Sequence, residues 1–487
     1  HPTVSLRIPV RASLRSELVP MLRLAVPVVM AELGWMAMGV VDTLMVGPLG
    51  PEAISAVGVG AAMHIAFAVF GMGVLLGLDT LVSQAFGAGD VRDCHRWLFD
   101  GLTLAALMTV PIMAVCLLLA DSIPSLGFHA EVAPPLQSYF VVVIWSTPFL
   151  LAYAACRRYL QGMHLAMPVM FALITANLLN AAMDWLLIYG HLGFPRLEVA
   201  GAAWATLLSR IYMFAALVAA IWWSTFAKAS ASAKASAFAE ATADKTADQT
   251  ADKTGAERHL EFWPAARFDP LRLKQLLMLG LPAASQVLAE VGVFALVTAL
   301  AGTLDPISAA SHQIALNLAG IAFMIPLGVG SAGAVRVGHA VGAGDPARAA
   351  AAGWTAILLG VAFMLSSGAL FVAMPRTLIG LFSSDPAVLS VGTSLLYLAA
   401  IFQLFDGIQG VITGTLRGIG DTRTPMLVNL AAHWLLGLPV SCTLCFVIGW
   451  GVWGLWVGLS LGLIVTGTIL LWVWARKVHD YRVAHGL

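Results

Sequence analysis

Twelve apolar segments, each long enough to cross a lipid bilayer, follow one another along this chain. The hydrocarbon core of a bilayer is about 30 Å thick, and a helix that rises about 1.5 Å per residue crosses it in roughly 20 residues. The chain is 60% hydrophobic and only 11% charged, a composition typical of a polytopic helical membrane protein. We therefore predict an all-α polytopic membrane protein with twelve transmembrane helices. The predicted spans are residues 21–46, 53–80, 97–120, 138–160, 166–189, 200–225, 273–302, 310–333, 353–375, 391–414, 424–447 and 451–475.

A polar tract separates the first six spans from the last six. It is rich in Ala, Thr, Ser, Lys and Asp and has almost nothing to bury in a core, which is typical of a flexible linker. The predicted parts, in chain order, are a cytoplasmic N-terminal segment (1–20), an N-terminal six-helix lobe (21–225), a cytoplasmic low-complexity linker (226–272), a C-terminal six-helix lobe (273–475) and a cytoplasmic tail (476–487).

Basic residues predict the orientation of the spans. With the N-terminus placed in the cytoplasm, 23 of the 26 Lys and Arg residues fall on the cytoplasmic side. Arg196 and Arg376 lie in outside loops, and Arg210 lies within the sixth span. Cytoplasmic loops carry an excess of Lys and Arg, so we predict that both termini are cytoplasmic, and we expect the membrane to be a bacterial inner (plasma) membrane.

The two halves of the chain repeat one another. Pro27 and Pro282 are 255 residues apart, and the turn QAFGAGD at residues 84–90 recurs as HAVGAGD at residues 339–345 with the same offset. Six spans per half is an even number, so both halves have the same topology and are related by a pseudo-two-fold axis along the membrane normal. Two such lobes around a cleft suit a transporter that opens alternately to either side of the membrane.

The N-terminal half carries a set of oxygen-bearing side chains within its spans. Asp42 lies in the first span, Asn177, Asn180 and Asp184 form one helical stripe of the fifth span, and Thr206 lies in the sixth. Carboxylate, amide and hydroxyl oxygens suit a small hard cation, so we predict a possible Na⁺ site at Asp42, Asn180, Asp184 and Thr206. If the two acids approach closely, the site can carry a proton instead. The alternative is a polar stripe that only hydrogen-bonds neighbouring helices.

The C-terminal half has two acids of its own within its spans, Glu290 in the seventh and Asp406 in the tenth. An unpaired carboxylate is costly within a bilayer, so two in separate spans indicate a shared cavity that binds a cation or a proton. Structural capping is the alternative. Other polar residues within the spans are candidates to line the substrate cleft: Glu32, Asn177, Gln286, Gln313, Asn317, Gln403 and Gln409. Glu32 either faces that cleft or pairs with Arg210.

The sequence contains no motif that indicates an enzyme. We find no G-x-S-x-G, no HExxH and no nucleotide-binding motif, and the GAGD turns lack the features of a phosphate loop. A net charge of zero argues against nucleic acid as a partner. The five cysteines are scattered over apolar segments, and we interpret them as core residues. We expect no tightly bound cofactor.

From about Met21 to Arg476 the chain resembles the multidrug and toxic compound extrusion (MATE) transporters. The segments that carry the resemblance are VDTLMVG with Asp42, QAFGAGD, NLLNAAMDWLLIYG, GLPAASQVLAEVGVFA with Glu290, AASHQIALNLAGIAFMIPLGVG and LFDGIQGVITGTLRGIGDTRTPM with Asp406. The long Ala/Thr-rich linker departs from the short connection usual in that family.

The resemblance implies twelve helices in two lobes and the export of organic, often cationic, compounds such as drugs and dyes in exchange for Na⁺ or H⁺. In the NorM-like branch the helix-7 and helix-10 acids correspond to Glu290 and Asp406. In the DinF-like branch the first-lobe residues correspond to Asp42, Asn180, Asp184 and Thr206. The chain carries both sets, so the resemblance leaves open which lobe couples the ion. The expected partners are small organic molecules and the lipid bilayer, and a monomer is expected.

Two other functions compete with antiport. A lipid-linked oligosaccharide flippase of the same wider superfamily needs several basic residues to hold a pyrophosphate, and the spans offer Arg210 alone. A membrane receptor or interaction scaffold that transports nothing does not require duplicated lobes. We therefore favour a secondary active multidrug antiporter.

Overall fold

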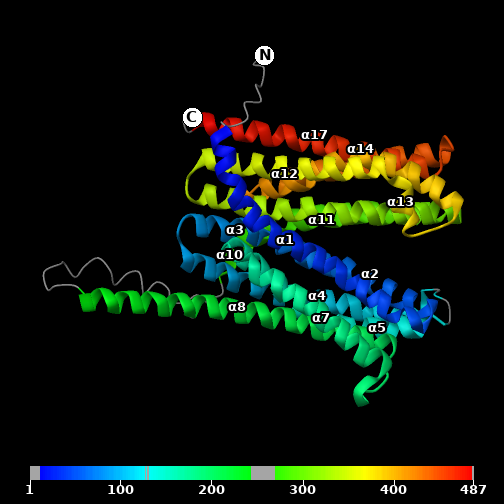
Figure 1. The fold of residues 1–487 in the computed structure, drawn as a ribbon, viewed down its shortest axis with the longest axis horizontal. Helices are drawn as coiled ribbons and strands as arrows, with labels where there is room; N and C mark the ends of the chain where they lie inside the picture. Colours follow the sequence, from blue (N-terminus) through cyan, green and yellow to red (C-terminus); the bar gives the residue numbers. More distant parts are fainter. Residues whose placement is uncertain (1–10, 127, 129–130, 243–268, 485–487) are drawn as a thin grey trace. The chain divides into compact units, whose positions relative to one another are not determined.

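The computed structural model describes residues 11–126, 128, 131–242 and 269–484, so residues 243–268 of the predicted linker lie outside the described part. Within that part every regular element is helical and none is a strand (Figure 1). The long helices are α1 (Arg11–Val46), α2 (Pro51–Val74), α4 (Val91–Ser122), α7 (Ala166–Tyr189), α8 (Val199–Thr242), α10 (Pro270–Gly302), α11 (Pro306–Gly342), α12 (Pro346–Ala373), α14 (Pro386–Gly418) and α17 (Val452–Ala484). The shorter ones are α3 (Gly77–Gly87), α5 (Ala133–Ile144), α6 (Thr147–Gly162), α13 (Pro375–Gly380), α15 (Arg423–Leu430) and α16 (Leu438–Cys442).

These helices form a multi-pass membrane protein. Eleven of the described helices are long and apolar enough to cross a bilayer, and a bent pair, α5 with α6, brings the number to twelve. Large apolar side chains such as Val110, Leu178 and Leu435 are 70%, 68% and 78% exposed, and a bilayer covers such surface without cost. The predicted all-α fold with twelve spans is confirmed.

Two spans are less regular than the hydropathy pattern predicts. The fourth is bent by 47° between α5 and α6. At the break the hydroxyl of Thr147 donates to the carbonyl of Ile144 at 2.6 Å, and Pro148 in the first turn of α6 has no backbone N–H to donate to α5. The eleventh contains two π-helical stretches, Ala431–Gly437 and Thr443–Val447, on either side of α16. Apolar composition does not distinguish a straight span from these.

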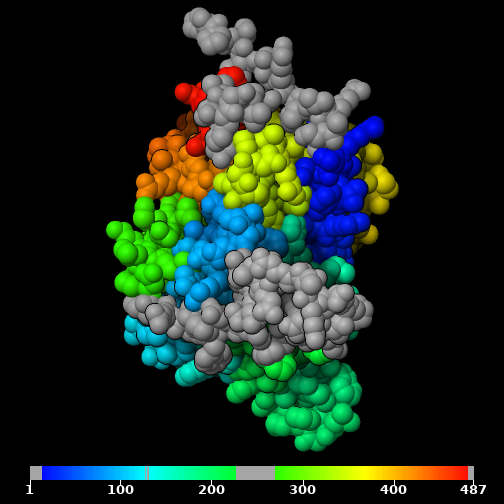
Figure 2. Space-filling view, turned by 90° about the vertical axis from the view of Figure 1, so that its left-hand side faces the viewer, coloured from blue at the N-terminus to red at the C-terminus, as the bar shows by residue number. Residues whose placement is uncertain are grey.

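The described chain divides into two compact units, and each boundary lies inside a helix. The first unit comprises residues 1–33 and 278–487, and the second comprises residues 34–277. Consequently α1 begins in the first unit and ends in the second, whereas α10 begins in the second and ends in the first. Within the first unit α11 packs against α12 and α14, and within the second α7 packs against α8; Figure 2 shows one face of the molecule in space-filling form, coloured along the chain.

Glycines bring α11 and α14 of the first unit into close contact. A Cβ atom added at Gly414 would lie 2.1 Å from the carbonyl oxygen of Gly330, and one added at Gly330 would lie 2.8 Å from that of Gly410. Small residues spaced four apart let two membrane helices approach until their backbones touch. The same helix, α14, carries Gln403, Asp406 and Gln409.

Candidate functional site

The predicted residues of the N-terminal half come together in the second unit. The Thr206 hydroxyl on α8 lies 3.1 Å from Asp42 Oδ2 on α1, and Asn180 and Asp184 on α7 are near enough to Asp42 to act on its charge. The exposed fractions are 5% for Asp42, 0% for Asn180, 0% for Asp184 and 3% for Thr206. We call these four residues the Asp42 cluster. The i, i+4 spacing of Asn180 and Asp184 places both on one face of α7.

Most polar atoms of the Asp42 cluster have no hydrogen-bond partner among the described residues. This holds for Asp42 Oδ1, for both amide atoms of Asn180 and for both carboxylate oxygens of Asp184. Buried polar atoms are normally satisfied, and those that are not often mark a place for an ion or water. Two carboxylates, an amide oxygen and a hydroxyl form a hard-oxygen donor set that fits Na⁺, or a proton shared by the acids. No group of three or more His, Cys, Asp and Glu in the described part of the chain is arranged to hold a metal ion.

Asn177, which the sequence places on the same stripe, has a different contact. Its amide nitrogen lies 2.9 Å from the carbonyl oxygen of Gly34 on α1 and 2.9 Å from that of Leu173. The side chain thus ties α7 to α1 close to the Asp42 cluster. Its role as a substrate contact stays a prediction.

A buried arginine lies one helical turn from Thr206. Arg210 is 6% exposed, and its guanidinium donates to the Ser146 hydroxyl and to His64 Nδ1, the latter at 3.3 Å. Because His64 Nδ1 accepts this bond, its Nε2 carries the hydrogen and donates to the Thr147 hydroxyl at 3.0 Å. The His64 imidazole is therefore neutral, and the Arg210 guanidinium carries the permanent charge of this hydrogen-bond network.

The charge of Arg210 acts on the Asp42 cluster. With both acids ionised, the two carboxylates and the Arg210 guanidinium would together carry a single negative charge, which one monovalent cation would neutralise. Sequence analysis noted Arg210 but missed Ser146 and His64. A histidine in the middle of an apolar span was the available signal for His64, whereas a serine at a helix break gives none.

The acids of the C-terminal half meet in the first unit. Gln409 Nε2 on α14 donates to Glu290 Oε1 on α10 at 3.1 Å, and Asn429 Nδ2 on α15 lies 3.5 Å from Glu290 Oε2. Asp406, which is 7% exposed, is near enough to Glu290 for their charges to interact. We call these four residues the Glu290 cluster. Sequence analysis missed Asn429, for which an amide within an apolar span was the signal.

The other polar candidates have separate environments. Gln403 is 0% exposed, and neither of its amide atoms has a partner among the described side chains and backbone. Gln286 lies 3.3 Å from the Thr413 hydroxyl. Gln313 donates to Asn317 one turn further along α11 at 3.2 Å, and both are exposed. Glu32 is 8% exposed in the part of α1 that belongs to the first unit.

A π-helical stretch lies beside the Glu290 cluster. It begins two residues after Asn429, and within it the Trp434 indole donates to the carbonyl of Ala289, the residue before Glu290, at 3.0 Å. His433 Nδ1 lies 3.2 Å from the backbone carbonyl of Asn429. Such single-turn bulges are rare and occur frequently at functional sites.

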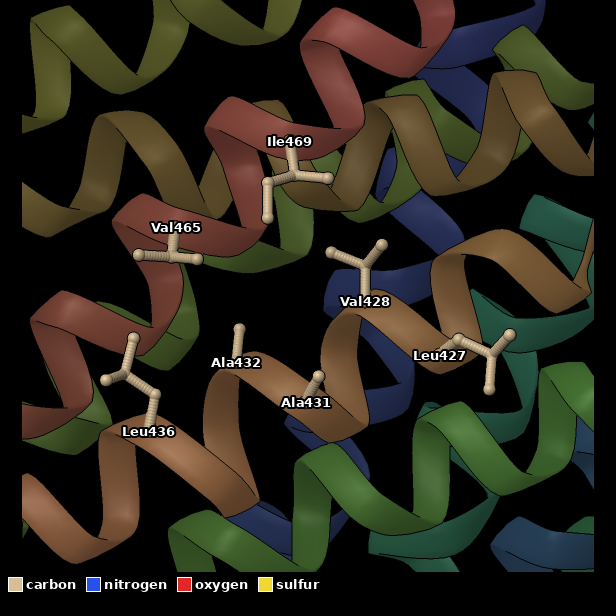
Figure 3. A pocket seen from close by; sticks show the side chains of 7 residues that line it. All are labelled: Leu427, Val428, Ala431, Ala432, Leu436, Val465 and Ile469. Atoms are coloured by element: carbon tan, nitrogen blue, oxygen red, sulfur yellow. The ribbon is translucent and has the colours of Figure 1, made fainter.

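An apolar cavity of about 380 Å³ lies on another side of this stretch (Figure 3). Val428, Ala431 and Ala432 point into it from one helix, and Val465 and Ile469 point toward them from α17. None of the acids lines this cavity, so it has no part in the chemistry of the Glu290 cluster.

Comparisons with known proteins agree with this architecture. The MatE family model matches residues 27–186 and again residues 282–443, one match in each half of the chain. A probable multidrug resistance protein NorM of Mesorhizobium japonicum is 34% identical over 470 residues, which cover 95% of this chain and 94% of that protein. The multidrug resistance protein NorM of Burkholderia vietnamiensis is 34% identical over 468 residues, with 94% of each covered.

Solved structures show the same fold. A eukaryotic MATE transporter superposes with a TM-score of 0.80 at 21% identity, covering 97% of this chain and 99% of that one. A MATE protein in a bent conformation superposes with a TM-score of 0.81 at 19% identity, covering 98% and 99%. With a family match in both halves and relatives of over 30% identity along nearly the whole length, the chain belongs to the MatE family, whose members are membrane transporters and not enzymes.

Proposed function

We propose that this protein is a secondary active antiporter that exports small organic compounds, many of them cationic, in exchange for Na⁺ or H⁺. The observation that carries the proposal is a buried acidic cluster in each unit, one of which holds two carboxylates with oxygens that have no described partner. Its relatives in Mesorhizobium and Burkholderia are named for multidrug resistance, which supports drugs and dyes as the substrates.

Exchange follows from the cost of charge within the membrane. A carboxylate in a span is stable only when a cation, a proton or a partner group neutralises it. If the coupling cation and the exported compound bind different conformations preferentially, each one shifts the population away from the state that holds the other. Binding of the cation from outside then favours release of the compound, and binding of the compound from inside favours release of the cation.

The direction of transport depends on how the protein is oriented in the membrane. We infer from the distribution of Lys and Arg that both termini are cytoplasmic. The bacterial origin of the NorM relatives supports the inner membrane as the location. In this orientation Asp42 lies toward the outer end of α1, because α1 begins at Arg11 and ends at Val46.

The test is efflux of a fluorescent organic cation, ethidium, from proteoliposomes under a Na⁺ gradient and, separately, under a pH gradient. Asp42→Asn, Glu290→Gln and Asp406→Asn are compared with Asp480→Asn. Asp480 is the matched control because its side chain is 64% exposed at the end of a helix.

Each outcome assigns a different role. Efflux under a Na⁺ gradient that is lost in Asp42→Asn places the coupling ion in the Asp42 cluster. Efflux under a pH gradient that is lost only in the Glu290 and Asp406 variants places it in the Glu290 cluster. Folded wild-type protein that moves ethidium under neither gradient contradicts the proposal and makes flipping of a lipid-linked oligosaccharide the function to test next.

A further inference from the structure

The apolar cavity of the first unit is open at the surface of the membrane spans. It lies between the helical stretch 427–436 and α17 (Figure 3). Three of the residues that line it, Leu427, Leu436 and Ile469, are exposed, whereas Ala432 is buried. The exposed flanks of a membrane span face lipid hydrocarbon, so the cavity is a groove that lipid can enter.

Small side chains leave this space between the two helices. Ala431 and Ala432 line the cavity at the start of the π-helical stretch. Further along the same stretch the helices meet through their backbones, because a Cβ atom added at Gly437 would lie 3.1 Å from the carbonyl oxygen of Gly458 on α17. Alanine side chains next to such a contact do not fill the space that the helices enclose, and a void is left.

The chemistry of the wall selects a hydrocarbon. Every residue that lines the cavity is a leucine, valine, alanine or isoleucine. A water molecule needs two to four polar partners, and these side chains offer none. A hydrocarbon chain, by contrast, gains dispersion contacts with the whole lining and loses no hydrogen bond.

The helix faces that line the groove each lead to an exposed arginine. Arg423 lies four residues before Leu427, and Arg476 lies seven residues after Ile469, so each arginine shares a face with a lining residue. Arg423 forms no ion pair within the described part of the chain. Arg476 pairs with Asp480 at 3.8 Å, and both side chains are 64% exposed. Such exposed pairs are weak, so both guanidinium groups are available to an anion.

An ion pair brings these two helix ends together. Lys477 Nζ lies 3.0 Å from Asp421 Oδ2, which joins the residue after Arg476 to the turn before Arg423. The indole of Trp472 lies between Ile469 and Arg476 along α17 and is exposed, with the Arg476 guanidinium 5.4 Å from the centre of its ring. Tryptophan and arginine at the end of a span are typical of the headgroup level of a bilayer. The same end of the groove therefore carries both arginines.

We propose that this groove binds an anionic phospholipid, with one acyl chain in the cavity and the phosphate between Arg423 and Arg476. We call the cavity with these two arginines the α17 groove. Guanidinium groups bind phosphate through charge-assisted hydrogen bonds. The same positive charges repel organic cations, so the compounds proposed for export do not suit this groove. The orientation proposed above places the lipid in the cytoplasmic leaflet, where anionic lipids attract basic residues.

The first test measures lipid binding by native mass spectrometry of the full-length, delipidated protein. It is titrated with phosphatidylglycerol and, separately, with phosphatidylcholine that has the same acyl chains. The headgroup variants are Arg423→Gln and Arg476→Gln. The matched control is Arg376→Gln, which removes an exposed arginine of α13, a helix that does not line the groove.

The second test locates the acyl chain. Phosphatidylglycerol with a diazirine in its acyl chain is photocrosslinked to the protein, and the labelled peptides are identified after digestion. Ala431→Phe fills the cavity, and Ala369→Phe places the same side chain at an exposed position of α12 as the control.

We expect the wild type to bind phosphatidylglycerol more tightly than phosphatidylcholine. Each headgroup variant should weaken phosphatidylglycerol binding about fivefold, the worth of one basic residue at an anionic membrane surface, and Arg376→Gln should leave it unchanged. The label should fall within residues 424–437 and 461–472, and Ala431→Phe should remove it from them, while Ala369→Phe should not.

Equal affinities of the wild type for the two lipids overturn the inference, as does an equal loss in Arg376→Gln or a label spread evenly over the apolar helices. A dimer that carries no phosphatidylglycerol also overturns it and assigns the groove to a second copy of the chain. If Ala431→Phe elutes as misfolded protein in size-exclusion chromatography, the two variants of exposed arginines decide. Neither test uses transport, so a wild type that exports no ethidium contradicts the proposed function and leaves these results standing.

Discussion

Arg210 brings a fixed positive charge close to a cation site that sequence analysis built from carboxylate, amide and hydroxyl groups alone. It lies one turn from Thr206 on α8, and its guanidinium is held by Ser146 and His64. Replacing a buried arginine usually removes its charge and its hydrogen bonds at the same time, so a single variant does not show which loss causes the effect. Here Lys and Met variants separate the two effects, because lysine keeps the charge without the planar fork and methionine keeps neither.

Arg210→Met is expected to raise the apparent affinity for the coupling cation. At an effective dielectric of about 20, a unit charge within the same site changes the binding free energy of a cation by about 1–2 kcal/mol, which is roughly a tenfold change in affinity. The measurement is the Na⁺ concentration, or the proton concentration, that gives half-maximal ethidium efflux. Arg210→Lys is the control and should keep the wild-type value. An Arg210→Met protein with unchanged half-saturation would show that the guanidinium has only a structural role.

At the scale of single residues, the sequence does not show which side chains from distant parts of the chain come into contact. The four residues of the Asp42 cluster were predicted together because two of them share a helical stripe and the others are polar residues in apolar spans. Asn429 and Ser146 were missed because a lone amide or hydroxyl in a span has no periodicity. Whether the clusters bind the coupling ion stays a prediction.

At the scale of the helix, the pairing of α11 with α14 depends on glycine. A methyl group at Gly414 would lie 2.1 Å from the backbone oxygen of Gly330, and a backbone atom cannot turn aside as a flexible side chain can. Gly414 lies five residues along α14 from Gln409 and eight from Asp406, so we expect the positions of both side chains to depend on this contact.

Gly414→Ala is expected to destabilise the protein by about 1–3 kcal/mol, the usual cost of overpacking, and to reduce efflux by displacing the Glu290 cluster. The melting temperature in detergent measures the first effect. Gly320→Ala on α11 is the control, because nothing lies within 4 Å of a Cβ atom at that position, and it should melt like the wild type. Equal melting temperatures for the two variants would contradict the close contact between the helices.

Hydropathy locates the spans but does not describe their interiors. The bend between α5 and α6 depends on Thr147, whose hydroxyl replaces a lost backbone bond, and on Pro148, which donates none. The hydropathy pattern predicts a single span here and does not mark where the helix breaks. The hydropathy pattern does not mark the π-helical stretch beside Asn429 either; within it Trp434 donates to the carbonyl of Ala289 on α10, and His433 lies 3.5 Å from the Thr466 hydroxyl on α17.

At the scale of the whole molecule, the two units exchange helix starts. The fragment that precedes the predicted linker contributes the start of α1 to the first unit, and the fragment that follows it contributes the start of α10 to the second. Each fragment therefore contributes residues to both units.

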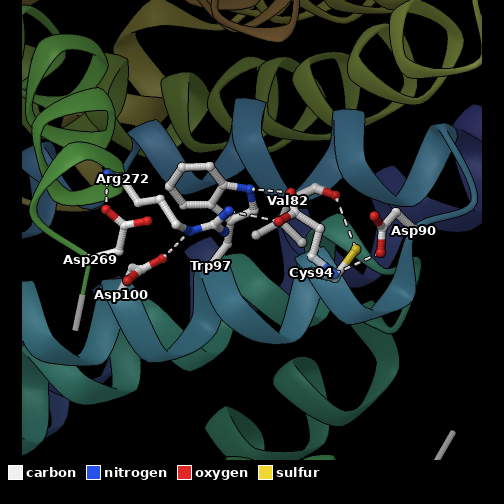
Figure 4. Close-up of polar contacts among 8 residues, drawn as sticks. Val82, Asp90, Cys94, Trp97, Asp100, Asp269 and Arg272 are labelled. Carbon is white, nitrogen blue, oxygen red and sulfur yellow. Dashed lines mark hydrogen bonds and ion pairs between the residues drawn. The ribbon is translucent and has the colours of Figure 1, made fainter. Parts of the chain in front are cut away.

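Cleavage within residues 243–268 is expected to leave the protein assembled. A protease site inserted in this tract and cut after purification should yield two chains that co-elute in size-exclusion chromatography in a mild detergent. Glu17 pairs with Arg336, and Arg272 pairs with Asp93 and Asp100 (Figure 4), so each ion pair joins one fragment to the other. Glu17→Gln combined with Arg272→Gln should therefore weaken the association of the cut chains, while Lys477→Gln, which removes an ion pair with Asp421 of the same fragment, should not. Separation of the cut wild-type chains would contradict an exchange that stabilises the assembly.

The amino-acid sequence by itself determined the membrane-spanning all-α class, the twelve spans, the repeat at 255 residues and the acids within the spans. These depend on segment length, polarity and spacing, which act locally and can be read along the chain. Only the tertiary structure decided that the starts of α1 and α10 pack in the unit made mostly from the other half of the chain, that Ser146 and His64 hold Arg210, and that Gln409 and Asn429 meet Glu290. These depend on which distant side chains meet, and hydropathy is the same for every arrangement that buries the same apolar surface.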